Sequence, residues 1–188
     1  MWQKIIFSFA VLIIVNFAYS QSEIEFFEDY FTLNTKNELL SQFVGNWKVN
    51  IAYFGGNQEE NAQGQMDAKL IFYYRILEMN FKIQSSVGLP FEMKYLIGYD
   101  GISKKFFLII LNSLTNEVQI LKGIYKDKTK EFIFNGTTVD TKQKKRVPLT
   151  MKFLFERDNK LIVEALSGEA NKEKLISKSM LIRLNKEE

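Results

Sequence analysis

The alternation of apolar and polar positions from Trp47 onward is the main structural signal in this sequence. In Leu77–Ile83 every second residue is apolar, and the residues between them are Glu78, Asn80 and Lys82. Because the side chains of a strand point alternately to its two faces, this period of two predicts a strand with one buried face. Trp47–Tyr53, Met93–Tyr99 and Val147–Phe155 continue this alternation. The other predicted strands are the apolar segments Phe106–Leu111, Val118–Tyr125, Phe132–Phe134, Leu161–Leu166 and Met180–Leu184.

Turn residues separate these segments at short intervals. Asp100-Gly101, Asp127–Lys130 and Asp158-Asn159 each stand between two predicted strands, and Gly55–Gly64 is predicted to be a long loop. Roughly ten short strands with a turn every 8–12 residues are typical of an antiparallel sandwich or barrel. Bulky aromatic residues along a meandering sheet favour a barrel, whose closure also removes exposed edges. We therefore predict an all-β fold, a single antiparallel up-and-down β-barrel of about ten strands.

A short helix is predicted just before the first strand. Asn34 or Thr35 can cap its start, and Leu39–Phe43 carries an apolar stripe with helical spacing. Gly45 is expected to end this helix. No helical pattern lies between the predicted strands, which argues against a parallel α/β sheet.

Met1–Ser20 has the features of a secretory signal peptide. Lys4 precedes the apolar run Ile5–Ala18, and small residues occupy the two cleavage-site positions. A membrane anchor is the alternative, but this run has 14 residues, whereas a span needs about 20. We expect cleavage after Ser20, a secreted or periplasmic protein without an integral membrane span, an N-terminal arm over residues 21–34 and a barrel domain over residues 35–188.

The composition removes most catalytic chemistries, because the chain has no Cys and no His. Disulfides, thiol nucleophiles, Ser-His-Asp triads and thiolate or imidazole metal sites are therefore excluded. We predict no catalytic residue, no metal site and no cofactor, and an enzyme using Tyr, Lys or carboxylates remains only a third alternative. A net charge of +3 is too small to indicate nucleic acid as a partner.

Arg75 is the most conspicuous polar residue among the predicted strands, because it lies in an apolar, aromatic run next to Tyr74. Inside a barrel, an arginine can bind a ligand carboxylate through two hydrogen bonds. At a turn, Arg75 would simply face water. In a strand, Glu78 or Glu92 could instead pair with it across strands. The predicted ligand-binding residues are Arg75, Tyr74, Phe81, Met93 and Tyr95.

The helix runs directly into Gly45-Asn46-Trp47, and the last predicted strand contains Arg183. This arrangement resembles that of lipocalins and their calycin relatives, which begin with Gly-x-Trp and pack a basic residue across the tryptophan. The resemblance implies that Gly45, Trp47 and Arg183 close one end of the barrel, with the guanidinium stacked on the indole.

Longer stretches resemble a narrower calycin-like family of uncharacterised, mostly bacterial proteins that is catalogued as a domain of unknown function. One departure is that this family often has Gly-Gly before the arginine matching Arg75, where this chain has the bulkier Tyr73 and Tyr74. The resemblance implies a lipocalin-like barrel and no established activity. The matching stretches are Leu40–Trp47, Arg75–Phe81, Leu89–Met93, Gly98–Phe106 and Gly123–Gly136.

Two functions follow from a barrel with many large apolar residues. If the interior leaves a cavity, burial of apolar surface would drive binding of a small apolar or amphipathic molecule. If Phe, Met and Leu side chains fill the interior, the barrel would act through its outer surface or loops as a structural or protein-interaction module. The amount of free interior volume decides between these two hypotheses.

Overall fold

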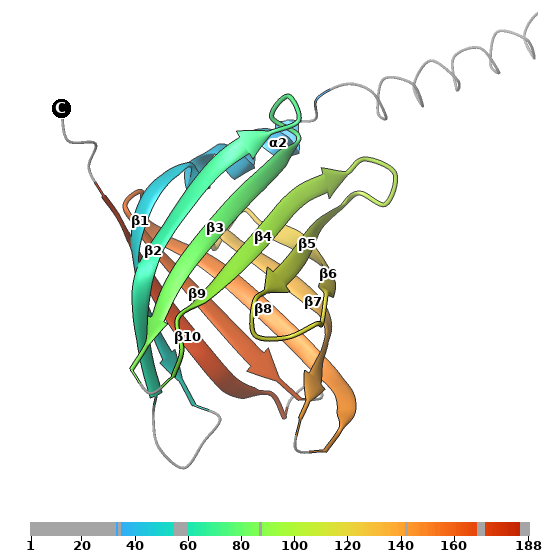
Figure 1. Ribbon diagram of the computed structural model, residues 1–188. Helices are drawn as coiled ribbons and strands as arrows, with labels where there is room; N and C mark the ends of the chain where they lie inside the picture. The colour runs from blue at the N-terminus through green and yellow to red at the C-terminus, as the bar shows by residue number, and fades with distance from the viewer. Residues whose placement is uncertain are drawn as a thin grey trace, which may run out of the picture. The chain divides into compact units, whose positions relative to one another are not determined.

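The period-two segments pair with their neighbours along the chain to form a closed antiparallel barrel (Figure 1). The computed structural model describes residues 33, 35–54, 60–86, 88–141, 143–168 and 172–184, and Thr35–Glu188 forms one compact unit. The ten strands are β1 (Gly45–Tyr53), β2 (Glu60–Ile71), β3 (Ile76–Ser85), β4 (Phe91–Asp100), β5 (Lys105–Asn112), β6 (Gln119–Lys126), β7 (Glu131–Asp140), β8 (Lys145–Arg157), β9 (Lys160–Ser167) and β10 (Lys174–Arg183).

Each strand pairs with the next one in sequence, and β1 closes the barrel by pairing with β10 as well as with β2. Trp47 lies opposite Arg183 in the β1–β10 pair and opposite Met66 in the β1–β2 pair. The predicted all-β barrel of about ten antiparallel strands is confirmed.

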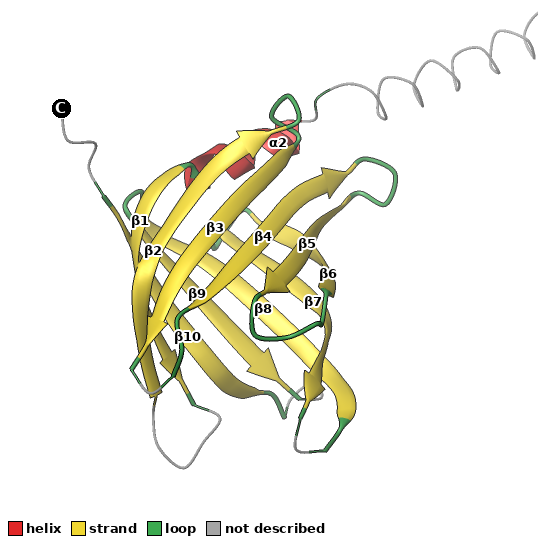
Figure 2. Cartoon of the chain, in the orientation of Figure 1, coloured by secondary structure: helices red, strands yellow, loops and turns green. Residues whose placement is uncertain are grey.

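The barrel has two different ends (Figure 2). We call the helix end the one that carries α2 (Thr35–Glu38) and the 3₁₀-helix η1 (Leu39–Phe43), together with the β2–β3, β4–β5, β6–β7 and β8–β9 turns. The connections β1–β2, β3–β4, β5–β6, β7–β8 and β9–β10 lie at the other end, which we call the loop end. The barrel interior is divided accordingly into a helix half and a loop half.

Burial follows the alternation that the sequence predicts. On β3, Leu77, Met79, Phe81 and Ile83 face the interior and are buried, whereas the residues between them are partly or fully exposed. Each inward side chain meets the inward side chains of the two neighbouring strands, since residues paired across antiparallel strands point to the same face. The core therefore lies inside the barrel.

The predicted helix is present, but it ends earlier than expected. Helical residues stop at Phe43, Val44 is already extended, and Gly45 is the first residue of β1 with φ +125°. This φ lies in a region that favours glycine, and the guanidinium of Arg183 lies 3.6 Å from the position that a Cβ would take. Gly45 therefore starts the first strand under Arg183 and does not end the helix.

The predicted long loop Gly55–Gly64 is wrong at its end, because residues 60–64 belong to β2. The inward positions here are the small residues Ala62 and Gly64, so the sequence shows no apolar alternation. A Cβ on Gly64 would lie 2.0 Å from the carbonyl oxygen of Lys82 on β3. The close approach of two strands thus replaces the usual large inward side chain.

The predicted signal peptide, residues 1–20, and nearly all of the predicted arm, residues 21–34, lie outside the described residues. Within the part of the chain that the structure describes, no helix combines the length and the apolar character needed to cross a bilayer.

Candidate functional site

The helix half of the interior is packed with aromatic rings. The ring of Phe43, from η1, lies 4.7 Å from that of Phe155 and 5.4 Å from that of Phe132, measured between centroids. Phe153 lies 6.1 Å from Phe43, and Trp47 lies 6.4 Å from Phe155. These tilted and edge-on contacts are the arrangements that aromatic pairs favour. The short helix therefore inserts Phe43 into the barrel and fills this half.

Arg183 joins the last strand to the first strand and to η1. Its guanidinium carbon lies 4.3 Å from the centre of the Trp47 ring, and its terminal nitrogens donate hydrogen bonds to the carbonyl oxygens of Val44 and Gln42. The indole N–H of Trp47 in turn donates to the carbonyl oxygen of Phe43 at 2.8 Å. The end of η1 is thus held by charge-assisted hydrogen bonds at a position where its carbonyls lack helical partners.

The loop half is lined differently, because polar inward side chains stand among its apolar ones. Tyr53 and Ser177 are paired across β1 and β10 and are only partly buried. On the opposite wall, Nε2 of Gln119 donates to Oγ1 of Thr138 at 2.8 Å. Large side chains at these positions would fill this half as Phe43 and its neighbours fill the other.

The exposure of the apolar lining also differs between the halves. Ten inward residues of the helix half are 0% exposed, whereas Phe155 is 8% exposed and Tyr99 and Tyr125 are half-buried. The ten are Leu40, Phe43, Trp47, Leu77, Met79, Ile97, Phe132, Phe153, Leu161 and Leu181. The inward apolar residues of the loop half keep 3–8% exposure: Ile51, Ala62, Ile83, Phe91, Ile110, Leu149 and Ala165. Solvent therefore reaches the inward residues of the loop half, and in the helix half it reaches Phe155 and the two tyrosines but not the residues packed around Phe43.

Tyr95 lies where the two halves meet. Its ring packs 4.7 Å from Phe81 and 6.4 Å from Phe153, and the residue is 8% exposed. Among the described residues, its hydroxyl has one hydrogen-bond partner, the sulfur of Met93 at 3.9 Å. Burial, with a smaller contribution from Tyr53, raises the pKa of Tyr95, so the hydroxyl keeps its proton. This hydroxyl is a buried donor whose acceptor, a thioether, is weak.

The rim of the loop end carries a second incompletely bonded group. Oε1 of Glu117 is buried and lacks a hydrogen bond within the described structure, although Nη1 of Arg146 lies 3.5 Å away as an ion pair. Nη1 of Arg146 also donates to Oγ1 of Thr137 at 2.9 Å. The rim can therefore accept one more hydrogen bond from a ligand or from water.

The structure brings together three of the five predicted ligand-binding residues. Phe81 and Met93 are direct partners across β3 and β4, and Tyr95 lies on the same inward face as Met93. Tyr74 and Arg75 lie elsewhere, in the exposed β2–β3 turn at the helix end. Of the two alternatives for Arg75, the structure therefore shows the turn. β2 runs on to Ile71, so residues 72–75 are needed to reverse the chain.

Glu78, the predicted cross-strand partner of Arg75, is bound by lysines. Its carboxylate accepts a hydrogen bond from Nζ of Lys94 at 3.0 Å and lies 3.4 Å from Nζ of Lys69. The bonds from Lys94 and from the amide of Asn80 are the main reasons why the pKa of Glu78 falls to about 2. This cluster lies on the outer face of the sheet and does not face the interior.

Residues 72–75 form an exposed turn between β2 and β3, which was not predicted from the sequence. Phe72, Tyr73 and Tyr74 have φ values of 49°, 54° and 66°, in the left-handed region that favours glycine. This geometry would suit the Gly-Gly step that the family resemblance implies where this chain has Tyr73 and Tyr74. The two tyrosines adopt the same backbone region and point bulky rings into solvent. The departure from the family pattern at Tyr73 and Tyr74 was the feature of the sequence that could have pointed to this turn.

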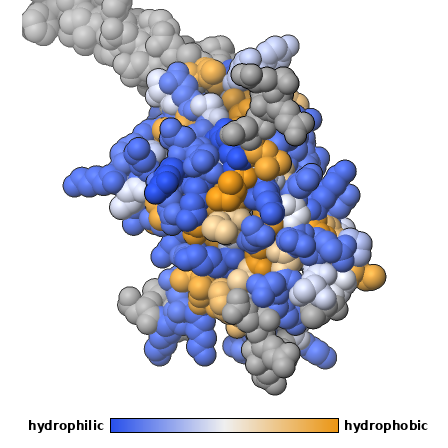
Figure 3. Space-filling view, turned by 90° about the vertical axis from the view of Figure 1, so that its left-hand side faces the viewer, coloured by the Kyte–Doolittle hydropathy of each residue, from blue (hydrophilic) through white to orange (hydrophobic). Residues whose placement is uncertain are grey.

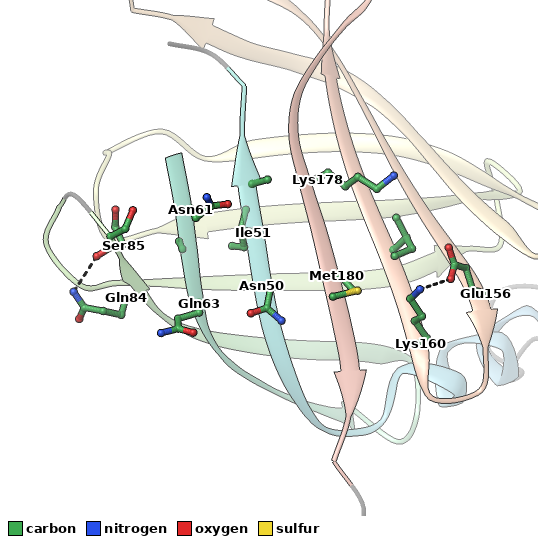
Figure 4. Close-up of a pocket in the computed structure, with 14 residues that line it drawn as sticks. Asn50, Ile51, Asn61, Gln63, Gln84, Ser85, Glu156, Lys160, Lys178 and Met180 are labelled. Atoms are coloured by element: carbon green, nitrogen blue, oxygen red, sulfur yellow. Dashed lines mark hydrogen bonds and ion pairs between the residues drawn. The ribbon is translucent and has the colours of Figure 1, made fainter. Parts of the chain in front are cut away.

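The described grooves lie on the outer face of the barrel. One, with a volume of about 640 Å³, crosses β10, β1, β2 and β3 (Figure 4). Its lining includes Asn50, Gln63 and Gln84, which are successive cross-strand partners, and Met180 beside Asn50. Figure 3 shows hydrophobic residues gathered across the middle of this side of the barrel, bordered by hydrophilic ones. A second groove of about 700 Å³ shares Gln63 and Gln84.

No group of three or more acidic side chains that could hold a metal ion occurs among the described residues. The whole sequence lacks His and Cys.

Comparisons with known proteins support the fold and leave the activity open. The family described as "Protein of unknown function (DUF1579)" matches residues 32–179. No curated protein matches the sequence. Among solved structures, Rv2717c from M. tuberculosis is 11% identical, with a TM-score of 0.61, over 81% of this chain and 99% of its own. The S-type phycobiliprotein lyase CPES from Guillardia theta is 12% identical, with a TM-score of 0.53, over 81% of this chain and 94% of its own. At these identities the likeness shows the fold alone.

Proposed function

We propose that this chain, which belongs to the DUF1579 family of proteins of unknown function, is a lipocalin-like barrel that binds a small apolar or amphipathic molecule in the loop half of its interior. We further propose that it is secreted or periplasmic, with cleavage after Ser20, on the strength of the apolar run Ile5–Ala18. Mass determination of the N-terminus of the natural protein tests the second proposal.

The observation that carries the binding proposal is the buried hydroxyl of Tyr95. Buried hydroxyls are normally satisfied, and leaving one weakly bonded costs free energy. The sulfur of Met93, at 3.9 Å, is a poor acceptor. A ligand oxygen in the loop half would give this hydroxyl a full hydrogen bond, and the pKa raised by burial keeps the proton available.

The apolar part of the ligand would lie against the lining around Tyr95. Phe81, Phe91 and Ile110 face the interior here, and apolar contact gains about 25 cal/mol per Å² of surface removed from water. The polar groups Gln119 and Ser177 on other walls favour a molecule with both apolar and polar parts. The name of the phycobiliprotein lyase gives this chain no activity, because the likeness reaches only the fold.

One observation favours the alternative function, a barrel that acts through its outer surface. The groove of about 640 Å³ across β10, β1, β2 and β3 is large enough to receive part of another molecule. Its lining combines the amide side chains of Asn50, Asn61, Gln63 and Gln84 with apolar residues. Glu156 and Lys160 also line it and form an ion pair of 2.7 Å. Under this alternative, substitutions inside the barrel would change stability only.

Native mass spectrometry of the protein from its own cells, before and after delipidation, tests the binding proposal. We expect a small molecule that dissociates and binds again, and an environment-sensitive apolar dye that it displaces. Tyr95→Phe should weaken rebinding by about tenfold, the value of one buried hydrogen bond. Tyr99→Phe is the matched control, since Tyr99 packs against Phe106 in the helix half. A delipidated protein that binds neither molecule nor dye would contradict the proposal.

A further inference from the structure

The β2–β3 turn exposes three aromatic side chains in a row. Phe72 is 70% exposed, Tyr73 91% and Tyr74 65%. The turn stands beside α2 at the helix end of the barrel (Figure 1). Soluble proteins rarely expose several large apolar side chains together unless the surface contacts another molecule. These three rings lie outside the barrel and do not contribute to the proposed ligand site.

The turn holds these rings in a defined and costly conformation. Three consecutive residues with left-handed φ, none of them glycine, are unfavourable because the Cβ atoms approach the following carbonyl oxygens. The backbone N–H of Arg75 donates to the carbonyl of Phe72 at 3.3 Å, and the amide of Asn37 in α2 donates to the carbonyl of Arg75 at 3.0 Å. Strain of this kind is a reason to look for a function at the same place.

The neighbouring β4–β5 turn presents a second apolar tip at the same end. Ile102 is 61% exposed. The carboxylate of Asp100 accepts hydrogen bonds from the backbone N–H of Ile102 at 3.0 Å and from the hydroxyl of Ser103 at 2.6 Å. Ile102 is therefore also held in a fixed turn, and the helix end carries two such apolar tips.

Basic residues accompany these tips. The four turns of the helix end contain four basic residues, Arg75, Lys104, Lys128 and Lys130, against two acidic ones, Asp127 and Asp158. α2 adds one of each sign, Lys36 and Glu38. The described connections of the loop end contain two of each sign, Lys144 and Lys172 against Glu117 and Glu173. The helix end is thus the more basic of the two, and its charge is complementary to an anionic surface.

We propose that the helix end docks on a membrane surface that contains anionic lipids. The rings of Phe72, Tyr73 and Tyr74 enter the headgroup region, where amphipathic aromatic residues prefer to lie. The basic residues of the adjacent turns contact lipid phosphates, so that an apolar and an electrostatic contribution act together. This orientation directs the loop end, and the ligand site proposed there, towards the aqueous phase.

Co-sedimentation with vesicles tests this proposal on the natural protein. We expect binding to vesicles of phosphatidylcholine with 30% phosphatidylglycerol, weaker binding to phosphatidylcholine alone, and loss of binding as salt is raised. The variant carrying Tyr73→Gly and Tyr74→Gly removes two rings, and glycine fits the φ values there, so the fold is retained. This variant should bind the anionic vesicles at least tenfold more weakly.

The matched control changes exposed apolar residues of the loop end. Leu89 and Leu114 are 78% and 60% exposed, and Leu89→Ser with Leu114→Ser should leave vesicle binding within twofold of the parent. Lys128→Gln with Lys130→Gln should weaken binding to anionic vesicles and leave binding to phosphatidylcholine unchanged. All variants share one N-terminus, so a contribution from residues before Thr35 cancels between them.

Three results would overturn the proposal. They are a parent protein that sediments with neither vesicle, a Tyr73→Gly, Tyr74→Gly variant that binds as well as the parent, and equal losses in the loop-end control. A parent that forms dimers which this glycine variant abolishes would show that a second copy covers the turn, which also overturns it. Ligand binding measured on the Tyr95→Phe protein is independent of these outcomes, so the two proposals can fail separately.

Discussion

The two halves of the barrel interior are built by the same strands and yet differ in what fills them. In the helix half, Phe43, Trp47 and Phe132 are completely buried and packed ring against ring. In the loop half, Tyr53 and Ser177 are partly buried. The interior of one closed barrel can therefore be tightly packed at one end and packed differently at the other. The helix half is closely packed with aromatic rings, whereas the loop half, where we propose that a ligand binds, has polar side chains among its apolar lining.

The largest expected effect tests the helix half. Trp47→Ala removes a fully buried indole, its hydrogen bond to the carbonyl of Phe43 and its contact with Arg183. We expect the free energy of unfolding to fall by about 3–5 kcal/mol, as for other large core truncations. Urea unfolding followed by circular dichroism measures this loss. An effect below about 1 kcal/mol, the size of a surface change, would show that this half is not the stabilising core.

A pair of enlarging substitutions compares the halves directly. Ala68 is buried in the helix half, where it pairs with Gly45 and Met79, so Ala68→Leu should overpack this half and cost about 1–3 kcal/mol. Ser177 is only partly buried in the loop half, so Ser177→Leu should change the unfolding free energy by less than about 0.5 kcal/mol. Ser177→Leu should also weaken dye binding, which Ala68→Leu should not. Equal destabilisation by both would mean that the halves are packed alike.

The strained turn outside the helix end should show a smaller effect with the opposite sign. Tyr73 and Tyr74 have left-handed φ values, which cost a residue with a Cβ about 1–2 kcal/mol each. Tyr73→Gly and Tyr74→Gly should each raise the free energy of unfolding by about 0.5 kcal/mol, after the entropy of the more flexible unfolded chain is subtracted. Thermal unfolding of the two single variants measures this gain. A loss of stability would show that the rings pack on the barrel.

A final small effect concerns charges on the outer face of the barrel, away from both halves of the interior. The pKa of Glu78 is lowered from 4.5 to about 2, chiefly by the hydrogen bonds from Lys94 and Asn80. Because the folded pKa is depressed, the stabilisation is complete above pH 4.5 and disappears as the pH falls towards 2. Its size should stay below about 1 kcal/mol, since both lysines are largely exposed. Glu78→Gln should remove this part of the acid dependence measured by urea unfolding.

The fold was predictable from the chain because its main signal is local. Leu77–Ile83 shows its burial by alternation alone, and the structure buries the residues that the pattern selects. The start of β2 escaped prediction because its inward residues, Ala62 and Gly64, are too small to form an apolar pattern. Their position depends on how closely β3 approaches, which is a property of the folded sheet.

The candidate site was predictable in part, for a related reason. Phe81, Met93 and Tyr95 lie on strands in which apolar and polar residues alternate. The alternation shows which residues point inward, so the direction of these three side chains followed from the pattern. The position of Arg75 did not follow from the pattern, because it depends on where β2 ends. β2 ends at Ile71, which leaves Arg75 in the turn. The sequence marked Arg75 as unusual without showing that it belongs to an exposed turn.

The sequence alone shows that this protein is a meander of half-buried strands, because the alternation within a strand identifies the residues on its buried face. Only the tertiary structure decided which end of the barrel is filled. Filling depends on η1 folding back so that Phe43 packs on Phe153 and Phe155, more than a hundred residues away in sequence, while Arg183 holds the end of η1. Such contacts join residues that share no local pattern, and their energies appear only when the barrel closes.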